Sequence, residues 1–215
     1  MKLDRDVIVA AALRLLDEVG LDGLTLRRLA QELDVQAPAL YWHVRNKREL
    51  LDLMAAKLTL DNIEMAAIGP GETWRDLVIA TSHAQRRTLL AHRDGARLVA
   101  GARPLEALLP RLEEMLAPLV EAGFTPGQAM RAIMTVSLYV GGFVLEEQAE
   151  QARWAEQEFS DADRAEFLRL ISRPGLQTVM KAFAESGDPN GDEAFEDGLS
   201  LIVDGLAQVL ARNGR

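Results

Sequence analysis

The chain has 215 residues, enough for one large domain or for a small domain joined to a larger one. Hydrophobic residues make up 48% of it and aromatic residues 5%, and the abundance of Leu, Ala, Glu and Arg favours helices over strands. The absence of cysteine excludes thiolate catalysis, disulfide bonds and cysteine-ligated zinc, and is compatible with a cytoplasmic protein. The three histidines lie far apart in the sequence, which argues against a histidine-based metal site.

The net charge is −9, which taken alone argues against nucleic acid as a partner. The charge is unevenly distributed, however, because residues 1–50 contain eight Lys or Arg and eight Asp or Glu and are therefore neutral. Between residues 27 and 48, five basic side chains accompany two acidic ones. We therefore expect one basic end that can contact DNA, whereas the rest of the chain carries the whole acidic excess and repels phosphate.

The first predicted helix is amphipathic. Apolar residues between Val7 and Val19 recur with a period close to 3.6 residues, which predicts one buried face. Gly20 follows at the position where a left-handed residue commonly ends a helix. A short second helix is expected after Thr25.

A tight turn at residues 34–36 separates the second helix from a brief third one. Pro38 fits the first turn of this third helix, where its missing N–H costs nothing, and the helix is expected from Ala39 to about residue 43. Asn46, followed three residues later by Glu49, resembles a capping box that begins a fourth helix, ending near residue 65.

The remainder of the chain is predicted to be helical as well. A break at residues 67–71 precedes helices over residues 73–91, 94–99, 105–122, 126–151, 161–170, 175–185 and 193–212. No segment alternates like a strand, so the expected fold class is all-α. We expect a helix-turn-helix domain at residues 1–46, a connecting helix at 47–66, and a helical body at 67–215. The apolar stretch at residues 133–145 is too short to span a bilayer, and no N-terminal leader is recognisable.

Three short helices with a tight turn between the second and third predict a helix-turn-helix. In such a motif the third helix enters the major groove while the second contacts the DNA backbone. Lys47, at the start of the fourth helix, lies where the helix dipole attracts a phosphate. Tyr41 and Trp42 can instead be core residues of the head, and for Trp42 the sequence leaves both interpretations open. Arg28 can likewise be a solvated surface charge.

Residues 24–30 (LTLRRLA), 38–44 (PALYWHV) and 46–48 (NKR) resemble the DNA-binding head of the TetR family. The resemblance continues at residues 71–74, 92–96, 101–104 and 144–148, where it is to the tetracycline-responsive members. It implies a repressor that binds a palindromic operator in double-stranded DNA as a homodimer and leaves it when a small-molecule effector binds the body. No catalytic residue and no cofactor are implied.

The resemblance also implies which residues contact DNA: Thr25, Arg27, Gln36, Pro38, Tyr41, Trp42, His43 and Lys47. Ala37 and Ala39 depart from the pattern, because the tetracycline-responsive members have hydrogen-bonding side chains at these two positions. Since such side chains read base edges, the preferred operator should differ.

At the ligand site the resemblance fails. Tetracycline-responsive members bind a magnesium chelate of the drug, and their key positions correspond to Ile63, Thr81, Gln85, Val99, Ala102 and Met115 here. Val99 replaces the metal-binding histidine and Ala102 replaces a residue that holds a metal-bound water. Neither supplies the oxygen ligands that magnesium requires. Glu146 remains, but one carboxylate makes a poor metal site. We therefore expect no metal site and an effector other than tetracycline–magnesium.

A largely apolar cavity with a few polar groups is expected instead, because flexible Met side chains adapt to irregular apolar ligands. The candidate lining residues are Thr81, Gln85, Val99, Arg103, Leu112, Met115, Leu116, Met130, Met134, Ser137 and Leu138. For each Met and Leu the alternative is an ordinary core position, which helical spacing alone explains. The resemblance further implies that the segment at residues 100–104 unwinds when the effector binds, moving the fourth helix and thereby the recognition helices.

Residues 126–151 and 193–212 are expected to dimerise as a four-helix bundle. Their small residues would allow close approach of helices: Ala129, Ala132, Gly141, Gly142, Gly198 and Gly205. The sequence disfavours two other functions. A helical enzyme lacks a nucleophile–base pair, and Glu146 and Glu147, as neighbours on a helix, point in different directions. A structural adaptor without DNA binding is disfavoured by the basic, aromatic head.

Overall fold

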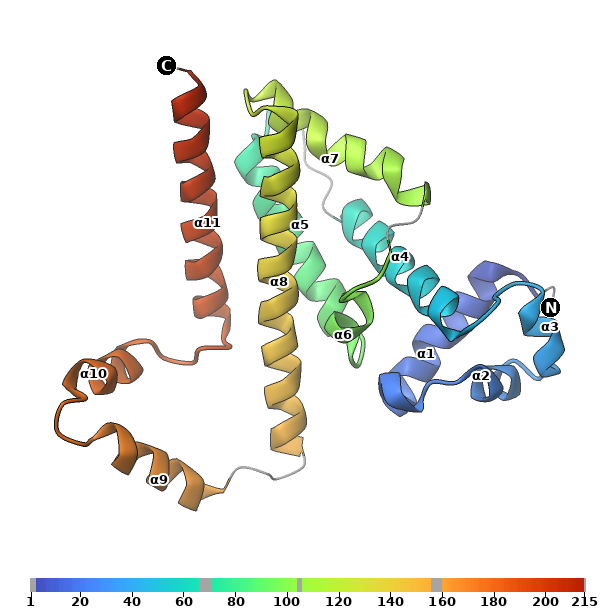
Figure 1. Ribbon diagram of the computed structural model, residues 1–215, viewed down its shortest axis with the longest axis horizontal. Coiled ribbons are helices and arrows are strands. Elements are labelled where there is room, and N and C mark those ends of the chain that lie inside the picture. The colour runs from blue at the N-terminus through green and yellow to red at the C-terminus, as the bar shows by residue number, and fades with distance from the viewer. Residues whose placement is uncertain (1–2, 66–70, 104–105, 156–159, 215) are drawn as a thin grey trace.

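The computed structural model describes residues 3–65, 71–103, 106–155 and 160–214, and within them the chain is helical without strands (Figure 1). The α-helices are α1 (Arg5–Gly23), α2 (Leu26–Glu32), α3 (Ala37–Tyr41), α4 (Lys47–Met65), α5 (Trp74–Leu90), α6 (Gly95–Val99), α7 (Leu109–Glu121), α8 (Pro126–Ala155), α9 (Asp161–Ile171), α10 (Gln177–Glu185) and α11 (Asp192–Asn213). A 3₁₀ turn, η1 (Glu106–Leu108), precedes α7. The predicted all-α fold class and order of helices are confirmed.

Local differences from the predictions have clear causes. Gly20 kinks α1 instead of ending it: with φ 69° it is left-handed, yet three further residues continue as helix to Gly23. α3 starts two residues earlier than expected, at Ala37, so that Pro38 occupies its first turn. At the start of α4, Asn46 accepts a hydrogen bond from the Glu49 N–H as a capping box requires. Glu49, however, accepts in return from the N–H of Arg45 and not from that of Asn46.

The head, formed by α1 to α3 with the first half of α4, has a complete hydrocarbon core. Ile8, Leu16, Leu29 and Leu40 are fully buried in it. One residue of the body, Leu98 of α6, belongs to the same buried cluster. The head and the body are therefore joined by apolar packing as well as by α4, which continues from one into the other.

In the body, α5 packs against α4 on one side and α8 on the other, and α11 packs on α8 (Figure 1). Three aromatic rings meet between α8 and α11: Tyr139, Phe143 and the fully buried Phe195. The guanidinium of Arg86 on α5 lies 4.7 Å from the centre of the Phe195 ring. It also bonds Glu147 on α8 and Asp192 on α11, at 3.2 and 2.6 Å. Arg86 thus joins three helices.

Both long body helices leave apolar side chains uncovered. Leu138 on α8 exposes 73% of its surface and Leu201 on α11 exposes 77%. Among the described residues, α8 is the one helix whose length and composition would let it cross a membrane. It is longer than the sequence predicted, but soluble core helices pass the same test, and α8 packs against α5, α7 and α11.

The helices α9 and α10 extend away from α8 and α11 as an arm (Figure 1). They contact each other through the rings of Phe167 and Phe183, whose centres are 5.1 Å apart. Apart from Ile171, the described side chains of both helices are exposed. The arm therefore adds little to the core of a single chain.

Candidate functional site

The helix-turn-helix is built by local sequence signals. Thr25 caps α2 by accepting a hydrogen bond from the N–H of Arg28. Asp34, with φ 51°, takes the left-handed conformation that turns the chain toward α3, and Asp tolerates this conformation better than most residues. Arg28, interpreted above as a possible surface charge, donates to the carbonyl of Gly23 and so stabilises the approach to α2.

The residues expected to contact DNA divide into two groups. Trp42 and Tyr41 expose 87% and 55% of their surfaces, so neither is a core residue, and the core interpretation of Trp42 is wrong. The other exposed residues of the set are Thr25, Arg27, Gln36 and Pro38. His43 and Lys47 are partly buried. The exposed set lies on α2, α3 and their flanks, as binding in a groove requires.

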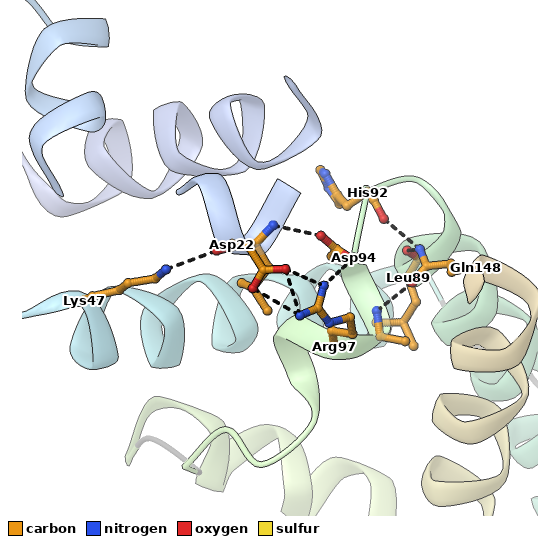
Figure 2. Close-up of polar contacts among 9 residues, drawn as sticks. Asp22, Lys47, Leu89, His92, Asp94, Arg97 and Gln148 are labelled. Atoms are coloured by element: carbon orange, nitrogen blue, oxygen red, sulfur yellow. Dashed lines mark hydrogen bonds and ion pairs between the residues drawn. The ribbon is translucent and has the colours of Figure 1, made fainter. Parts of the chain in front are cut away.

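Lys47 makes an internal contact in this structure. Its Nζ donates a hydrogen bond to the backbone carbonyl of Leu21, at 3.1 Å (Figure 2). The N–H of the same residue, Leu21, donates to Oδ2 of Asp94 at 2.8 Å. The Leu21 peptide thus connects a candidate DNA-contacting lysine to the body.

Hydrogen bonds between residues 17–22 and residues 92–97 form what we call the head–body joint. Arg97 of α6 pairs with Asp94 and, across the joint, with Asp22 at 3.2 Å. Asp17 accepts from the N–H of Arg93 and contacts the His92 ring. Partial burial alone would raise the pKa of Asp94, but the Leu21 N–H and the Arg97 guanidinium hold that pKa below its ordinary value of 3.8.

The joint is anchored to α8 by one side chain. Gln148 donates from Nε2 to the carbonyls of Leu89 and His92, at 3.1 and 2.8 Å, and its Oε1 accepts from the N–H of Ala96 (Figure 2). The turn between α5 and α6 is therefore held by the helix that also packs on α11. A displacement of α8 or α5 has a direct path to the head.

A second set of contacts links α4 to the segment after α6. Arg48 donates to the carbonyl of Gly101 and pairs with Asp52. Asp52 accepts from the backbone N–H of Arg103 at 3.1 Å. This is the segment expected to unwind, and its Pro104 lies outside the described residues. Gly101 is left-handed, with φ 71°, a conformation that suits a residue at a hinge.

A cavity of about 240 Å³ lies in the body, with walls from α4, α5, α6, η1, α7 and α8. Six of the expected lining residues are brought together there: Thr81, Gln85, Val99, Leu112, Met115 and Ser137. None of the described residues that line it is charged. The walls are therefore mostly hydrocarbon with scattered hydroxyl and amide groups.

Five expected residues do not line this cavity: Arg103, Leu116, Met130, Met134 and Leu138. Met134 and Leu138 are exposed on the face of α8 that looks away from the core, because a period of 3.6 residues alone does not say which apolar face meets α5. Arg103 is exposed and engages α4 through its backbone. Leu116 packs with the buried cluster around Leu119 and Phe124. Met130 is partly buried.

The sequence missed other lining residues: Leu58, Thr59, Leu77, Val78, Thr88, Leu89, Leu108, Ile133 and Val136. Leu58 and Thr59 show that α4 forms a wall of the cavity as well as the connection to the head. The sequence predicted α4 as a connecting helix and none of its residues as lining. The pairing of apolar Leu58 with the hydroxyl of Thr59 was the one sequence signal for a wall with a polar group. The side chain of Ile63, further along α4, lies outside the described residues.

The small residues expected in the dimer interface also divide. Ala129 and Ala132 are buried within the chain, and an added Cβ at Gly198 would meet the Tyr139 hydroxyl at 2.3 Å. These three serve packing inside one chain, contrary to expectation. Gly141, Gly142 and Gly205 have no heavy atom within 4 Å of an added Cβ, and so lie beside open space.

Comparisons with known proteins agree with this architecture. A family model described as bacterial regulatory proteins, tetR family, matches residues 8–54, and one described as tetracyclin repressor-like, C-terminal domain, matches residues 69–210. The chain is 43% identical to the tetracycline repressor protein class A from transposon 1721 of Escherichia coli, over 99% of this chain and 95% of that protein.

Two solved structures are similar over nearly the whole chain. TetR (class A) in complex with 5a,6-anhydrotetracycline and magnesium has a TM-score of 0.71 at 38% identity, covering 96% of this chain and 99% of its own. ActR from Streptomyces coelicolor in complex with (S)-DNPA has a TM-score of 0.81 at 30% identity, covering 98% and 100%. With both domains matched and this degree of identity, the chain belongs to the tetR family of bacterial regulatory proteins.

Proposed function

We propose that this ligand-responsive repressor leaves its palindromic operator when a small, largely apolar molecule fills the body cavity. One observation carries the proposal: α6 takes part in both the cavity and the head–body joint. Val99 lines the cavity, while Leu98 beside it is buried in the core of the head, and Arg97 pairs with Asp22. As a regulator of bacterial genes it would act in the cytoplasm, where the operator is.

Operator contact is assigned to the two groups of residues described above. Arg27, Gln36 and Pro38 are exposed near the groove-facing end of the motif and suit base edges. Tyr41 and Trp42 offer flat rings to the sugar–phosphate backbone. On binding DNA, Lys47 would give up its hydrogen bond to the Leu21 carbonyl and contact a phosphate instead. Because Leu21 also bonds Asp94, this exchange would be coupled to the head–body joint.

The homodimer is assigned to the uncovered faces of α8 and α11. Leu138, Leu201 and Leu145 are exposed apolar side chains on these helices, and the open glycines permit close packing. Paired across a two-fold axis, the helices would make a four-helix bundle. The bundle would present two heads at a fixed spacing, which an operator with two half-sites requires.

Tetracycline–magnesium is not the proposed effector, although several relatives carry the name of tetracycline repressors. The class A structure contains a tetracycline and magnesium. Here Val99, at the position of the metal-binding histidine of such relatives, is a hydrocarbon wall of the cavity. Among the described residues, no group of three His, Cys, Asp or Glu side chains could hold a metal ion.

The proposal is tested with operator DNA selected from a random duplex library by the full-length protein. Binding of that duplex is measured by fluorescence anisotropy with and without candidate effectors. We expect the protein to bind a two-fold symmetric sequence as a dimer. We expect anhydrotetracycline with magnesium to leave its affinity for that sequence unchanged. Failure to select any duplex at low salt contradicts the DNA-binding role, and release by anhydrotetracycline with magnesium contradicts the proposed effector class.

A further inference from the structure

Three of the polar side chains that line the cavity share one hydrogen-bonding character. The described lining contains five polar side chains, those of Thr59, Thr81, Gln85, Thr88 and Ser137. For Thr59, Thr81 and Gln85, the hydrogen-bond donor of the side chain is already bonded to another group of the protein. What these side chains still offer to a ligand therefore decides which ligand suits the cavity.

Two of the three lining threonines, Thr59 and Thr81, can only accept a hydrogen bond from a ligand. The hydroxyl of Thr59 donates to the carbonyl of Ala55 at 2.9 Å, and that of Thr81 donates to the carbonyl of Leu77 at 2.7 Å. A hydroxyl has a single hydrogen, so each oxygen is left with lone pairs alone. Such an oxygen can accept a hydrogen bond from a ligand but has no hydrogen left to donate.

Gln85 adds a further acceptor. Its Nε2 lies 3.3 Å from the backbone carbonyl of Ser137 and 3.1 Å from the Ser137 hydroxyl. A carbonyl cannot donate, so the NH₂ group must be the end that faces Ser137, and this fixes the orientation of the amide. The Oε1 atom of this lining residue has no hydrogen-bond partner among the described residues, and it can accept from a ligand.

Charge excludes other ligands. No described lining residue is Lys, Arg or His, so a carboxylate, sulfonate or phosphate would be buried without a counter-ion. No described lining residue is Asp or Glu, so an ammonium group would be equally unpaired. The desolvation cost of either ion is large compared with what the neutral walls return.

We propose that the effector is an uncharged, mainly hydrocarbon compound that carries hydroxyl groups, an alcohol or a phenol. Its hydroxyls donate to Thr81 and Gln85, which lie four residues apart on α5 and so share one helix face. Thr59, on the α4 wall, accepts from a third hydroxyl. This assignment rests on the proposed function, because it takes the cavity to be the effector site.

Three probes of one size test the inference on the full-length dimer by titration calorimetry: 2-naphthol, 2-methoxynaphthalene and 2-naphthoate. The first donates a hydrogen bond, the second can only accept, and the third is an anion at neutral pH. We expect 2-naphthol to bind roughly tenfold more tightly than 2-methoxynaphthalene, which is about the contribution of one neutral hydrogen bond. We expect 2-naphthoate to bind most weakly.

Variants show whether the preference arises at the named acceptor. Thr81→Val removes the acceptor at nearly constant shape and should reduce the preference for 2-naphthol to about twofold or less. Thr81→Ser keeps the hydroxyl and should keep the preference. Ser82→Ala is the matched control, because Ser82 makes the same bond to the carbonyl four residues earlier, at 2.7 Å, but is buried away from the cavity. It should leave the preference unchanged.

The outcomes separate this inference from the proposed function. Selection of an operator by the unliganded protein tests the repressor role without any probe. If that succeeds, equal binding of 2-naphthol and 2-methoxynaphthalene, tightest binding of 2-naphthoate, or no binding of any probe overturns the effector class alone. A preference that survives in Thr81→Val, or that is lost in Ser82→Ala, also counts against it.

Discussion

The head and the body differ in how much of their packing one chain completes. In the head, side chains such as Ile8, Leu16 and Leu40 are fully buried within a single chain. The body contains a cavity, two long helices with uncovered leucines, and an arm that is nearly all exposed. The hydrophobic core of the DNA-binding part is therefore complete within one chain. The regulated part is left open for a partner and a ligand, which is where conformational change is least costly.

The joint between the two regions differs from both. Its contacts are mainly hydrogen bonds and ion pairs, such as those of Asp94 and Arg97, with one apolar side chain, Leu98, inserted into the head. Polar contacts of this kind are individually weak and directional. The polar contacts can therefore be exchanged at low cost, whereas Leu98 ties the joint to the core of the head.

The largest effect is expected where the body is least complete. Leu138→Glu combined with Leu201→Glu places charges on the uncovered faces of α8 and α11, where burial against a partner would be unfavourable. The chain should stay folded, because both residues are exposed, but it should be monomeric. Operator affinity should fall at least about a hundredfold, because one head engages one half-site. Sedimentation and anisotropy measure the two effects.

Leu109→Glu is the control for this pair of substitutions. Leu109 on α7 exposes 59% of its surface, so it is comparably apolar and exposed, but it lies off the α8 and α11 faces. Its substitution should leave the dimer and the operator affinity unchanged. A dimer that persists in the double variant would place the interface elsewhere on the body.

The next largest effect is expected on the stability of the body, at the contacts of Arg86 that join α5, α8 and α11. Arg86 is largely buried, pairs with Glu147 and Asp192, and covers two aromatic rings. Arg86→Met keeps most of the volume but leaves Glu147 buried without its partner, and should lower the free energy of unfolding by about 3 kcal/mol. Urea denaturation of the body measures this change.

Arg75→Met is its matched control. Arg75 also combines an ion pair, with Asp204, and a ring contact, with Trp74, but all at an exposed site. Its loss should cost less than about 1 kcal/mol, since exposed pairs contribute little. Equal losses in the two variants would show that burial does not set the strength of the Arg86 contacts.

A smaller effect on operator affinity is expected from a substitution in the head. Trp42→Ala removes a side chain that is almost fully exposed, so the unfolding free energy should change by less than about 0.5 kcal/mol. Operator affinity should fall about tenfold, because the proposed contact between the ring and the DNA backbone would be lost. Leu40→Ala, at the fully buried neighbour, should show the reverse pattern with a large loss of stability. Unaltered operator binding by Trp42→Ala would remove the ring from the interface.

The sequence predicted the regular features well because they depend on local signals. The cap at Thr25, the position of Pro38 and the 3.6-residue period of α1 each concern neighbouring residues, and their elements lie within a few residues of the predicted bounds. The kink at Gly20 was not predicted, because a glycine with positive φ is compatible with either a bend within a helix or the end of the helix. The tertiary setting, in which Leu21 meets Asp94, decides between the two outcomes.

The cavity was harder to predict, because it depends on which face of each helix turns inward. Residues on α5 that were expected in the lining, such as Thr81 and Gln85, are there. On α8, Ser137 lines the cavity while Met134 and Leu138 point outward, a distinction that requires the rotation of the helix. Contacts over long sequence distances, such as Lys47 with Leu21 and Gln148 with His92, left no pattern in the sequence.

The smallest effect is expected at the joint, and it depends on pH. Asp94→Asn keeps a side chain that tolerates the left-handed backbone at φ 58° but removes the charge that faces Arg97. Because the pKa of Asp94 is lowered from 3.8, its contribution to stability is full above that pH and is lost as the pH falls through the lowered pKa. At neutral pH the variant should be about 1 kcal/mol less stable, and the difference should vanish in acid.

Asp76→Asn separates the joint from acid stability in general. The pKa of Asp76 is also lowered, by hydrogen bonds from the Thr73 side chain and backbone, but this contact lies within the cap of α5 and does not reach the head. Both variants should flatten the acid limb of the stability profile. Only Asp94→Asn should speed hydrogen exchange at the amide of Leu21, whose N–H bonds Asp94. If Asp76→Asn also exposed that amide, the head would be responding to loss of body stability and not to loss of the joint, and the polar contacts at α6 would carry no signal of their own.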